Sequence, residues 1–423
     1  MEHMMKTTIK WTSVAMAVAM ANGLMITQAA ADEKAGFIEG ASATLSNRTI
    51  NFSRDFRSSG ADQSRRDETA TGFVLDFQSG YSHGAIGIGA DVLALGGIKL
   101  DGGEGQAETG LLPSEYDVTS GPTEYAEIRG AVKVRVAGDT EFRYGVHRLE
   151  NPIITFDDSR LLPSHYNGYS VTNTSIDGLF LEAGRMNDRS EMNSSSQTRG
   201  AFEEKEKVTY LGGSYEFSDN LSTSLYTSKA DELFKRHFLG LTHTLPLAGE
   251  LSLTSDVAYY HTSDENSAND EFDNKAASVA FTLGAGHHGF TLAYQRMSGD
   301  AGFNYYDFAI YLANSIQYAD FNAKDERSWQ ARYDYDFEGL GIPGLTFMTR
   351  YIRGSNIDTD FEGLTAGRDT RWERNTNIGY TIQGGALEGV NLLWRNATVR
   401  QDIGFDGDVD ENRLIVSYTW DLL

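Results

Sequence analysis

The sequence predicts an all-β fold, a transmembrane β-barrel of 18 antiparallel strands with short turns at one end and long loops at the other. Apolar and polar residues alternate with a period of two through most of the chain, which is typical of strands with two different faces. Short and long connections also alternate, and nothing beyond residue 31 has the ~20 consecutive apolar residues of a membrane-spanning helix. Because backbone polar groups in lipid must all be paired, only a closed barrel reconciles this pattern with a membrane.

Residues 1–31 are predicted to be a cleaved signal peptide. A short basic segment precedes a mostly apolar segment at 11–26, and an A-x-A cleavage site follows at 29–31. An N-terminal membrane anchor is the alternative, but the apolar segment is short and Asn22 interrupts it. Residues 32–423 are then expected to form one barrel in the outer membrane of a Gram-negative bacterium.

The composition excludes several classes of function. The 423 residues include no cysteine, which excludes disulfides, iron–sulfur clusters and thiolate zinc sites. The chain has 36 Lys and Arg against 60 Asp and Glu, a formal net charge of −24. Such a chain is unsuited to nucleic acid, because phosphate contacts need clustered basic side chains. We expect no nucleic-acid partner and no cofactor.

The strands are assigned from this alternation, in chain order. Val132 and Val134, for example, flank Lys133, and the same pattern recurs down the chain. Seventeen strands are predicted, at 37–52, 71–81, 84–94, 124–136, 139–147, 176–185, 206–217, 220–229, 232–244, 249–262, 272–284, 288–297, 327–338, 344–353, 371–383, 389–400 and 411–421. Single-chain bacterial barrels have an even number of strands, so an eighteenth, weaker strand is expected within 187–204.

The connections between these strands differ in length in a regular way. The short ones are at 82–83, 137–138, 218–219, 246–248, 285–287 and 338–343, and the long ones are at 53–70, 95–123, 148–175, 298–326 and 354–370. An outer-membrane barrel puts its short turns at the periplasmic end and its long loops outside. A soluble β-helix or large sandwich is the alternative, and it has no reason to collect the short turns at one end.

Basic side chains on the water-filled face are notable in so acidic a chain. The alternation predicts that seven of them project inward: Lys133, Arg135, Arg143, Arg332, Arg350, Arg395 and Arg413. Arg148, at the start of a long loop, is included with them. A row of arginines in a lumen attracts anions, and a guanidinium pairs with a carboxylate in a bidentate fork. The alternative is that these residues neutralise lumen carboxylates such as Asp76, Asp91 and Asp334.

Two of the long connections, 148–175 and 298–326, are predicted to fold into the lumen and narrow it. They are rich in aromatic and amide side chains, unlike simple solvated loops. The expected constriction residues are Asp157, Asp158, Arg160, His165, Tyr166, Tyr305, Tyr306, Asp307, Asn314 and Ser315.

Three short motifs are interpreted as turns or loops. The G-x-S-x-G sequence at 80–84 and the G-x-G-x-x-G sequence at 284–289 are both flanked by predicted strands, whereas their catalytic or nucleotide-binding versions precede a helix. The acidic stretch at 406–410 departs from a calcium-binding loop at its sixth and twelfth positions. No metal site is predicted, although a weak calcium site at the external rim stays open.

Several stretches resemble the OprD family of substrate-specific outer-membrane porins, also called outer-membrane carboxylate channels. The strongest are Leu312-Ala313-Asn314-Ser315-Ile316-Gln317-Tyr318 and Ser328-Trp329-Gln330-Ala331-Arg332-Tyr333-Asp334, and others occur in order along the chain. The resemblance implies a monomeric or weakly oligomeric 18-stranded barrel, uptake of small carboxylate-bearing nutrients such as organic acids or amino acids, an arginine ladder, and a constriction built by the loops at 148–175 and 298–326. The implied partners are the lipid bilayer, lipopolysaccharide, small carboxylates and the barrel-assembly machinery.

One departure bears on the substrate. Family members often carry Arg-x-Arg in the next-to-last strand, where this chain has Leu393-Trp394-Arg395, so one rung of the ladder is expected to be missing. A passive channel, not an enzyme, is the leading hypothesis. The rivals are an outer-membrane hydrolase that uses Ser82 and His83, and an adhesin or phage receptor that uses the acidic loops.

Overall fold

The computed structural model describes residues 36–57, 63–113, 122–199, 207–231, 233–264, 273–303, 311–358, 370–401 and 407–423, with the backbone alone at 197–199. The predicted signal peptide at 1–31 lies outside these residues.

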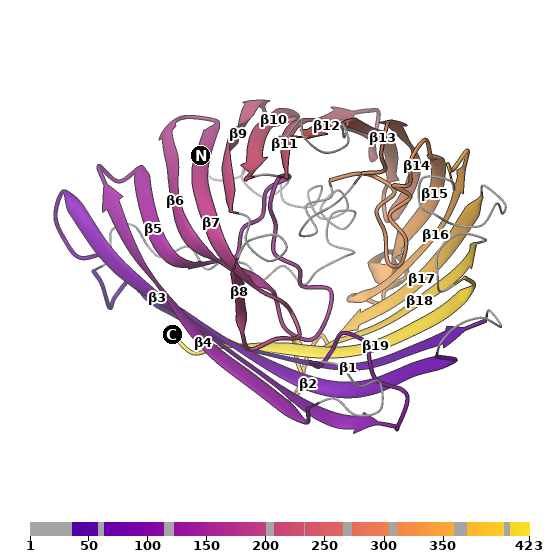
Figure 1. The fold of residues 1–423 in the computed structure, drawn as a ribbon, viewed down its shortest axis with the longest axis horizontal. Helices are drawn as coiled ribbons and strands as arrows, with labels where there is room; N and C mark the ends of the chain where they lie inside the picture. The colour runs from indigo at the N-terminus through magenta and orange to yellow at the C-terminus, as the bar shows by residue number, and fades with distance from the viewer. Residues whose placement is uncertain are drawn as a thin grey trace.

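Eighteen antiparallel strands close into a barrel, as the sequence predicts (Figure 1). Each strand pairs with its neighbours in the chain, and β1 pairs with both β2 and β19, which closes the ring. The strands are β1 (Ser42–Phe56), β2 (Arg65–Gln78), β3 (Ile86–Gly102), β4 (Glu124–Val136), β5 (Thr140–His147), β6 (His165–Ile176), β7 (Leu179–Ser190), β9 (Val208–Ser218), β10 (Leu221–Ala230), β11 (Phe234–Pro246), β12 (Leu251–Asp264), β13 (Asp273–Ala285), β14 (His288–Gly299), β15 (Arg327–Asp336), β16 (Leu345–Ser355), β17 (Arg371–Thr381), β18 (Asn391–Gln401) and β19 (Val409–Asp421).

Two short elements add to the barrel without being part of its ring. The strand β8 (Gln197–Arg199) pairs only with the end of β7, which pairs directly with β9 along the rest of its length. The 3₁₀ helix η3 (Phe337–Leu340) forms the turn between β15 and β16. In the described part of the chain, no helix is long and apolar enough to cross a membrane.

The position of one predicted strand was wrong. The eighteenth strand is β6, inside the stretch predicted as a loop at 148–175, and not a strand within 187–204. The loop between β5 and β6 therefore ends at residue 164, and His165 and Tyr166 belong to a strand. The outward face of β6 carries Asn167 and Asn173 besides its apolar residues, so the alternation that marks the other strands is lost.

The two faces of the wall differ as the alternation predicts. On β14, Leu292 and Tyr294 are exposed while Ala293 and Gln295 are buried. The outward face is dominated by aliphatic and aromatic side chains that have no protein cover, and in water so large an apolar surface would be unfavourable. Lipid provides the cover, because period-two strands of a membrane barrel point every second side chain at the bilayer.

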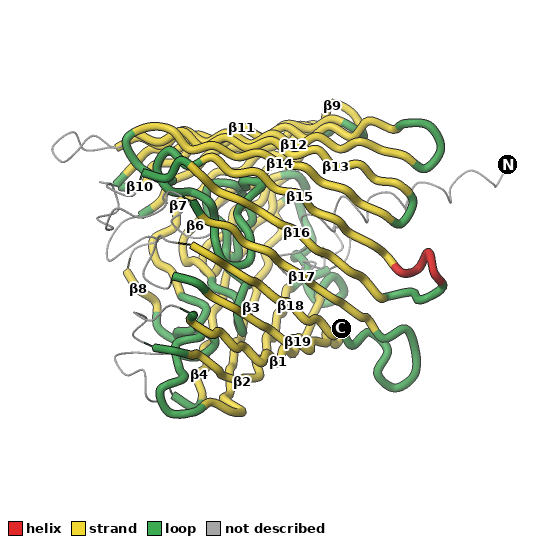
Figure 2. The backbone as a smooth tube through the Cα atoms, turned by 90° about the vertical axis from the view of Figure 1, so that its right-hand side faces the viewer, coloured by secondary structure: helices red, strands yellow, loops and turns green. Residues whose placement is uncertain are grey.

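The two ends of the barrel also differ (Figure 2). The short turns, the helix η3 and the C-terminus lie together at one end, the turn end, and the long connections lie at the other, the loop end. The chain begins and finishes its barrel at the turn end, where Thr44 on β1 is paired with Asp421 on β19.

Loops fold into the barrel and build two apolar clusters against its inner wall. One cluster joins Ile153, Ile154 and Phe303 of the loops to inward residues of β6–β14 such as Tyr260. The second joins Leu161 and other loop leucines to the inner face of β1–β5. The inner wall made by β15–β19 is polar by contrast, and it carries the candidate site.

Candidate functional site

The inner wall of β15–β19 carries four buried arginines, which we call the arginine wall. Arg332 and Arg350 are directly opposite each other on β15 and β16, and Arg395 and Arg413 are opposite each other on β18 and β19. β17 lies between the two pairs, with Asn375 directly opposite Arg350 and Asn377 directly opposite Arg395. Like charges directly opposite each other destabilise a sheet, so this arrangement favours an anion in front of it.

Two members of the arginine wall are neutralised by carboxylates beside them. Arg332 donates to both oxygens of Asp334 (2.8 and 2.7 Å). Arg413 donates to Glu411 (2.7 Å), and the same carboxylate accepts two hydrogen bonds from Arg54 of β1.

The other two members, Arg350 and Arg395, make no ion pair or hydrogen bond with a carboxylate among the residues that the structure describes. Arg350 donates from Nε to Asn375 (2.7 Å), while its Nη2 is buried without an acceptor. Arg395 is 5% exposed and makes no hydrogen bond or ion pair within the described ranges, and its Nε is buried. A buried guanidinium with unpaired donors is costly, and an anion supplied from outside the chain would satisfy it.

Three of the four basic residues predicted on the facing wall are neutralised by carboxylates. Lys133 and Arg143 share Asp91, at 2.8 and 2.6 Å, and Arg148 pairs with Asp76. The remaining one, Arg135, lies over the ring of Tyr81, with 4.2 Å from Cζ to the ring centroid. For Lys133, Arg143 and Arg148 the alternative interpretation, that they balance lumen carboxylates, describes the structure.

The loop between β5 and β6 is held against the arginine wall. Arg48 of β1 donates to both carboxylate oxygens of Asp158 (2.8 and 2.6 Å) and to the carbonyl oxygens of Asp158 and Arg160 (3.1 and 2.7 Å). Arg413 donates to the carbonyl oxygen of Ser159 (3.1 Å). The loop is therefore anchored by two arginines that project inward from neighbouring strands.

The charged residues of this loop are desolvated. Burial lowers the pKa of Arg160 to about 9, with a further lowering by the positive charge of Arg413, so this side chain stays cationic at neutral pH. Burial raises the pKa of Asp157, which accepts hydrogen bonds from the backbone N–H and the hydroxyl of Ser159. Arg160 thus adds a further guanidinium beside the arginine wall.

Other residues that the sequence predicts for the constriction brace the loops. His165 and Tyr166 of β6 are fully buried, and the Tyr166 hydroxyl donates to the carbonyl oxygen of Thr155 (3.0 Å). Asn314 is also fully buried and donates to Ser328 (2.8 Å). The predicted residues Tyr305, Tyr306 and Asp307 lie outside the described residues.

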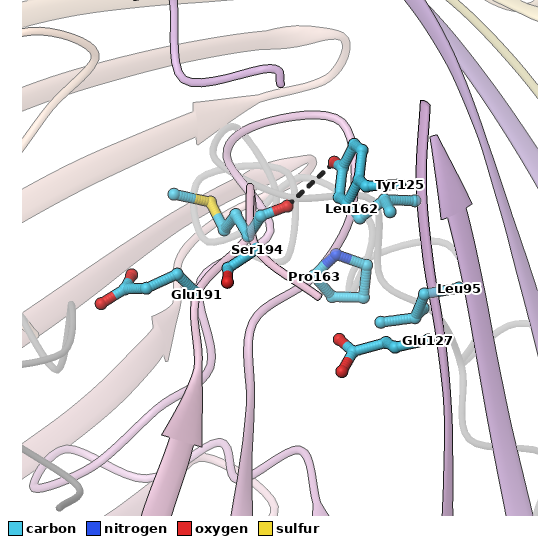
Figure 3. A pocket seen from close by; sticks show the side chains of 8 residues that line it. Leu95, Tyr125, Glu127, Leu162, Pro163, Glu191 and Ser194 are labelled. Carbon is cyan, nitrogen blue, oxygen red and sulfur yellow. Dashed lines mark hydrogen bonds between the residues drawn. The ribbon is translucent and has the colours of Figure 1, made fainter. Parts of the chain in front are cut away.

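Two further segments, after β3 and after β7, contact the loop from β5 to β6. Figure 3 shows Tyr125 of β4 pointing at the segment after β7, where its hydroxyl donates to the carbonyl oxygen of Met192 (3.1 Å). The same hydroxyl is 3.0 Å from the carbonyl oxygen of Leu111, in the loop after β3. One inward tyrosine thus connects segments that follow two different strands.

The loop between β14 and β15 is held by a carboxylate that sequence reasoning missed. Glu373 of β17 accepts hydrogen bonds from the backbone N–H groups of Tyr318 (3.1 Å) and Ala319 (2.9 Å) and from the Asn375 side chain (2.7 Å). The loop is thereby pinned in front of the arginine wall. Sequence reasoning also missed two inward arginines of β1. Arg48 lies on the strand predicted at 37–52 and Arg54 lies just beyond it, and the alternation puts both on the face opposite Asn51.

We expect Glu373→Gln to loosen this loop, because the amide keeps one acceptor and loses the charge that strengthens both backbone bonds. Hydrogen exchange in peptides covering 311–322 should become faster by roughly tenfold, which corresponds to the free energy of one charge-assisted hydrogen bond. The matched control is Glu338→Gln in the exposed turn helix η3. Unchanged exchange at 311–322 would show that Glu373 does not anchor the loop.

The predicted turn motifs are turns. Ser82 lies between β2 and β3, and its Oγ accepts a hydrogen bond from the Ile88 backbone N–H (3.0 Å). A strand follows it, whereas a nucleophile elbow leads into a helix. The motif at 284–289 joins β13 to β14. In the acidic stretch at 406–410, Asp410 accepts hydrogen bonds from arginine side chains at positions 57 and 400.

The comparisons with known proteins agree with this architecture. The family model described as outer membrane porin, OprD family, matches residues 35–422. The chain belongs to the OprD family. It is 35% identical to Porin D of Pseudomonas aeruginosa over 450 residues, which cover 98% of this chain and 99% of Porin D. It is 34% identical to the porin-like protein GalP of Pseudomonas putida, over 92% of this chain and 94% of GalP.

Solved structures of family members have the same fold. The crystal structure of OccK9 (OpdG) of Pseudomonas aeruginosa matches with a TM-score of 0.86 and 38% identity, covering 92% of this chain and all of that one. OpdK of the same organism, whose structure was determined with vanillate, matches with a TM-score of 0.81 and 33% identity, covering 91% and 100%. This OprD-family porin is therefore an outer-membrane protein of a Gram-negative bacterium, with its turn end in the periplasm and its loop end outside.

Proposed function

We propose that this porin is a passive channel for small carboxylate-bearing nutrients, such as organic acids and amino acids. The observation that carries the proposal is the pair Arg350 and Arg395, which are buried in the inner wall with donors that no described residue accepts. A planar guanidinium fork fits a carboxylate, and inward arginines make a pore selective for anions. The family name alone would not distinguish a selective channel from an open one.

The surrounding groups support a binding step within the pathway. Glu373 is engaged by the loop between β14 and β15, and Glu411 is engaged by Arg54 and Arg413, so neither carboxylate makes a hydrogen bond to Arg395. OpdK, a relative crystallised with vanillate, has bound a molecule with one carboxylate, and we extend that chemistry to this chain.

We further propose that the barrel is inserted by the barrel-assembly machinery and acts as a monomer or weak oligomer, because each of the eighteen strands of its ring is paired on both sides within one chain. A hydrolase that uses Ser82 is not favoured, since its hydroxyl is engaged in a hairpin turn and no helix follows. An adhesin or receptor role gains no support from the described residues.

In planar bilayers, benzoate is expected to interrupt the single-channel current at lower concentrations than its neutral isostere benzamide. The reason is that only the carboxylate satisfies the unpaired guanidinium donors. We expect a difference of roughly tenfold in the concentration that halves the open time. Equal effects of the two molecules would contradict carboxylate selectivity, and hydrolysis of test esters that is lost in Ser82→Ala would favour the enzyme instead.

A further inference from the structure

The outward face of the wall from β13 to β18 carries a row of basic side chains near its external end. Each of these six consecutive strands has one outward Lys or Arg, and these strands have no other at their outward positions: Lys275, Arg296, Arg327, Arg353, Arg374 and Arg400. Figure 2 faces this wall. The periplasmic halves of the same outward faces carry mainly aliphatic, aromatic and threonine side chains, as a lipid-facing surface does.

Three adjacent members of the row are unpaired. Arg296, Arg327 and Arg353 are exposed and make no side-chain hydrogen bond or ion pair with any residue in the described ranges. Arg296 and Arg327 are directly opposite each other on β14 and β15, an arrangement that is unfavourable without an anion. In a chain with a net charge of −24, the absence of an ion pair between these three arginines and any described carboxylate points to an external anionic partner.

The opposite side of the barrel differs in this respect. Arg65 on β2 pairs with Asp67, and Arg185 on β7 pairs with Asp231 at 2.6 Å. The outward arginines Arg65 and Arg185, on β2 and β7, are thus neutralised by carboxylates of the protein. The outward arginines of β14–β16 have no such pair among the described residues.

Aromatic side chains lie among the three arginines. Trp329, Tyr351 and Trp372 form a continuous outward row on β15, β16 and β17, with ring centroids 5.6 and 5.7 Å apart. Trp329 is directly opposite Arg353 in the sheet register. Rows of aromatic residues mark the interface between hydrocarbon and headgroups in membrane barrels, so the arginines are at the level of the outer-leaflet headgroups.

We propose that this patch, Arg296, Arg327 and Arg353 with the aromatic row, binds the phosphorylated glucosamine headgroup of lipopolysaccharide. Its two phosphate groups on a disaccharide supply paired oxygens for guanidinium forks, and the sugar rings suit the aromatic faces. The three cations lie on three neighbouring strands, so that more than one of them can face the two phosphates. The inference goes beyond carboxylate transport and depends only on the outer-membrane location.

The test is native mass spectrometry of the purified full chain in detergent, titrated with bisphosphorylated lipid A. The variant R296Q/R327Q/R353Q should bind lipid A roughly a hundredfold more weakly, since each arginine near an anionic lipid surface is worth about a fivefold factor in affinity. The matched control R57Q/R65Q/R185Q removes the same charge from arginines that are paired with carboxylates, and it should bind like the wild type.

A change in the ligand avoids any question of folding. Wild-type protein should bind dephosphorylated lipid A and phosphatidylglycerol much more weakly than bisphosphorylated lipid A. Equal binding of the triple variant and the wild type would overturn the proposal, as would equal binding of dephosphorylated lipid A or of phosphatidylglycerol. Benzoate block in the triple variant should be unchanged, which separates this outcome from failure of the carboxylate pathway.

Discussion

Replacing Arg395 by glutamine is expected to lower the flux of benzoate through reconstituted channels by roughly tenfold, the cost of one charge-assisted hydrogen bond. The side chain is buried on β18 and makes no hydrogen bond within the described part of the chain, so its removal breaks no protein contact of that kind. It also relieves the repulsion from Arg413 on the next strand. The barrel should therefore be at least as stable as the wild type, as measured by heat-modifiable mobility on gels.

Arg332→Gln is the matched control for this substitution. It removes the same charge from the same wall, but Arg332 already donates two hydrogen bonds to Asp334. We expect it to change benzoate flux much less than Arg395→Gln does. If both variants lose flux equally, the wall acts only through its summed charge, and if neither does, the assignment of Arg395 is wrong.

The second large effect is expected for Arg48→Ala, which should release the loop between β5 and β6 from the wall. Arg48 makes four hydrogen bonds to Asp158 and Arg160, and its pair with Asp158 is largely buried. Removing one partner of a buried ion pair costs about 3–5 kcal/mol, which exceeds the contribution of any single hydrogen bond that still holds the loop, such as those from Arg413 to Ser159 and from Tyr260 to Pro152. Single-channel conductance should rise, and block by benzoate should weaken.

Arg65→Ala provides the comparison, because Arg65 makes an exposed ion pair with Asp67 at the rim, and exposed pairs contribute little. Its conductance should match that of the wild type. An unchanged conductance in Arg48→Ala would mean that the apolar contacts of the loop hold it without this anchor.

The strands were predictable where one face meets lipid and the other does not. On β4, Val132 and Val134 face outward and Lys133 faces inward. This alternation of apolar and charged residues is visible in the sequence itself. On β6, polar residues occupy both faces, so the alternation fails there. The turn after it offered a second signal: Asp177 and Gly178 join β6 to β7, Gly178 has φ 74°, and Asp-Gly is a strong hairpin sequence.

The sequence predicts that the arginine side chains of the site point into the lumen, but it does not predict which of them pair with carboxylates. Alternation correctly predicted that four arginines point inward, because successive side chains of one strand point to opposite faces of the sheet. These are Arg332, Arg350, Arg395 and Arg413. Whether each has a carboxylate beside it depends on residues of other strands. The loop anchors were hidden for the same reason, since Glu373 meets Tyr318 only when β17 and the distant loop share one lumen.

A structure of the protein determined with benzoate is the most direct test of the arginine wall. The carboxylate should lie about 2.7–2.9 Å from guanidinium nitrogens of Arg395 and Arg350. Benzoate bound instead beside Lys133 and Arg143, or no bound benzoate at concentrations that block the channel, would contradict the carboxylate pathway.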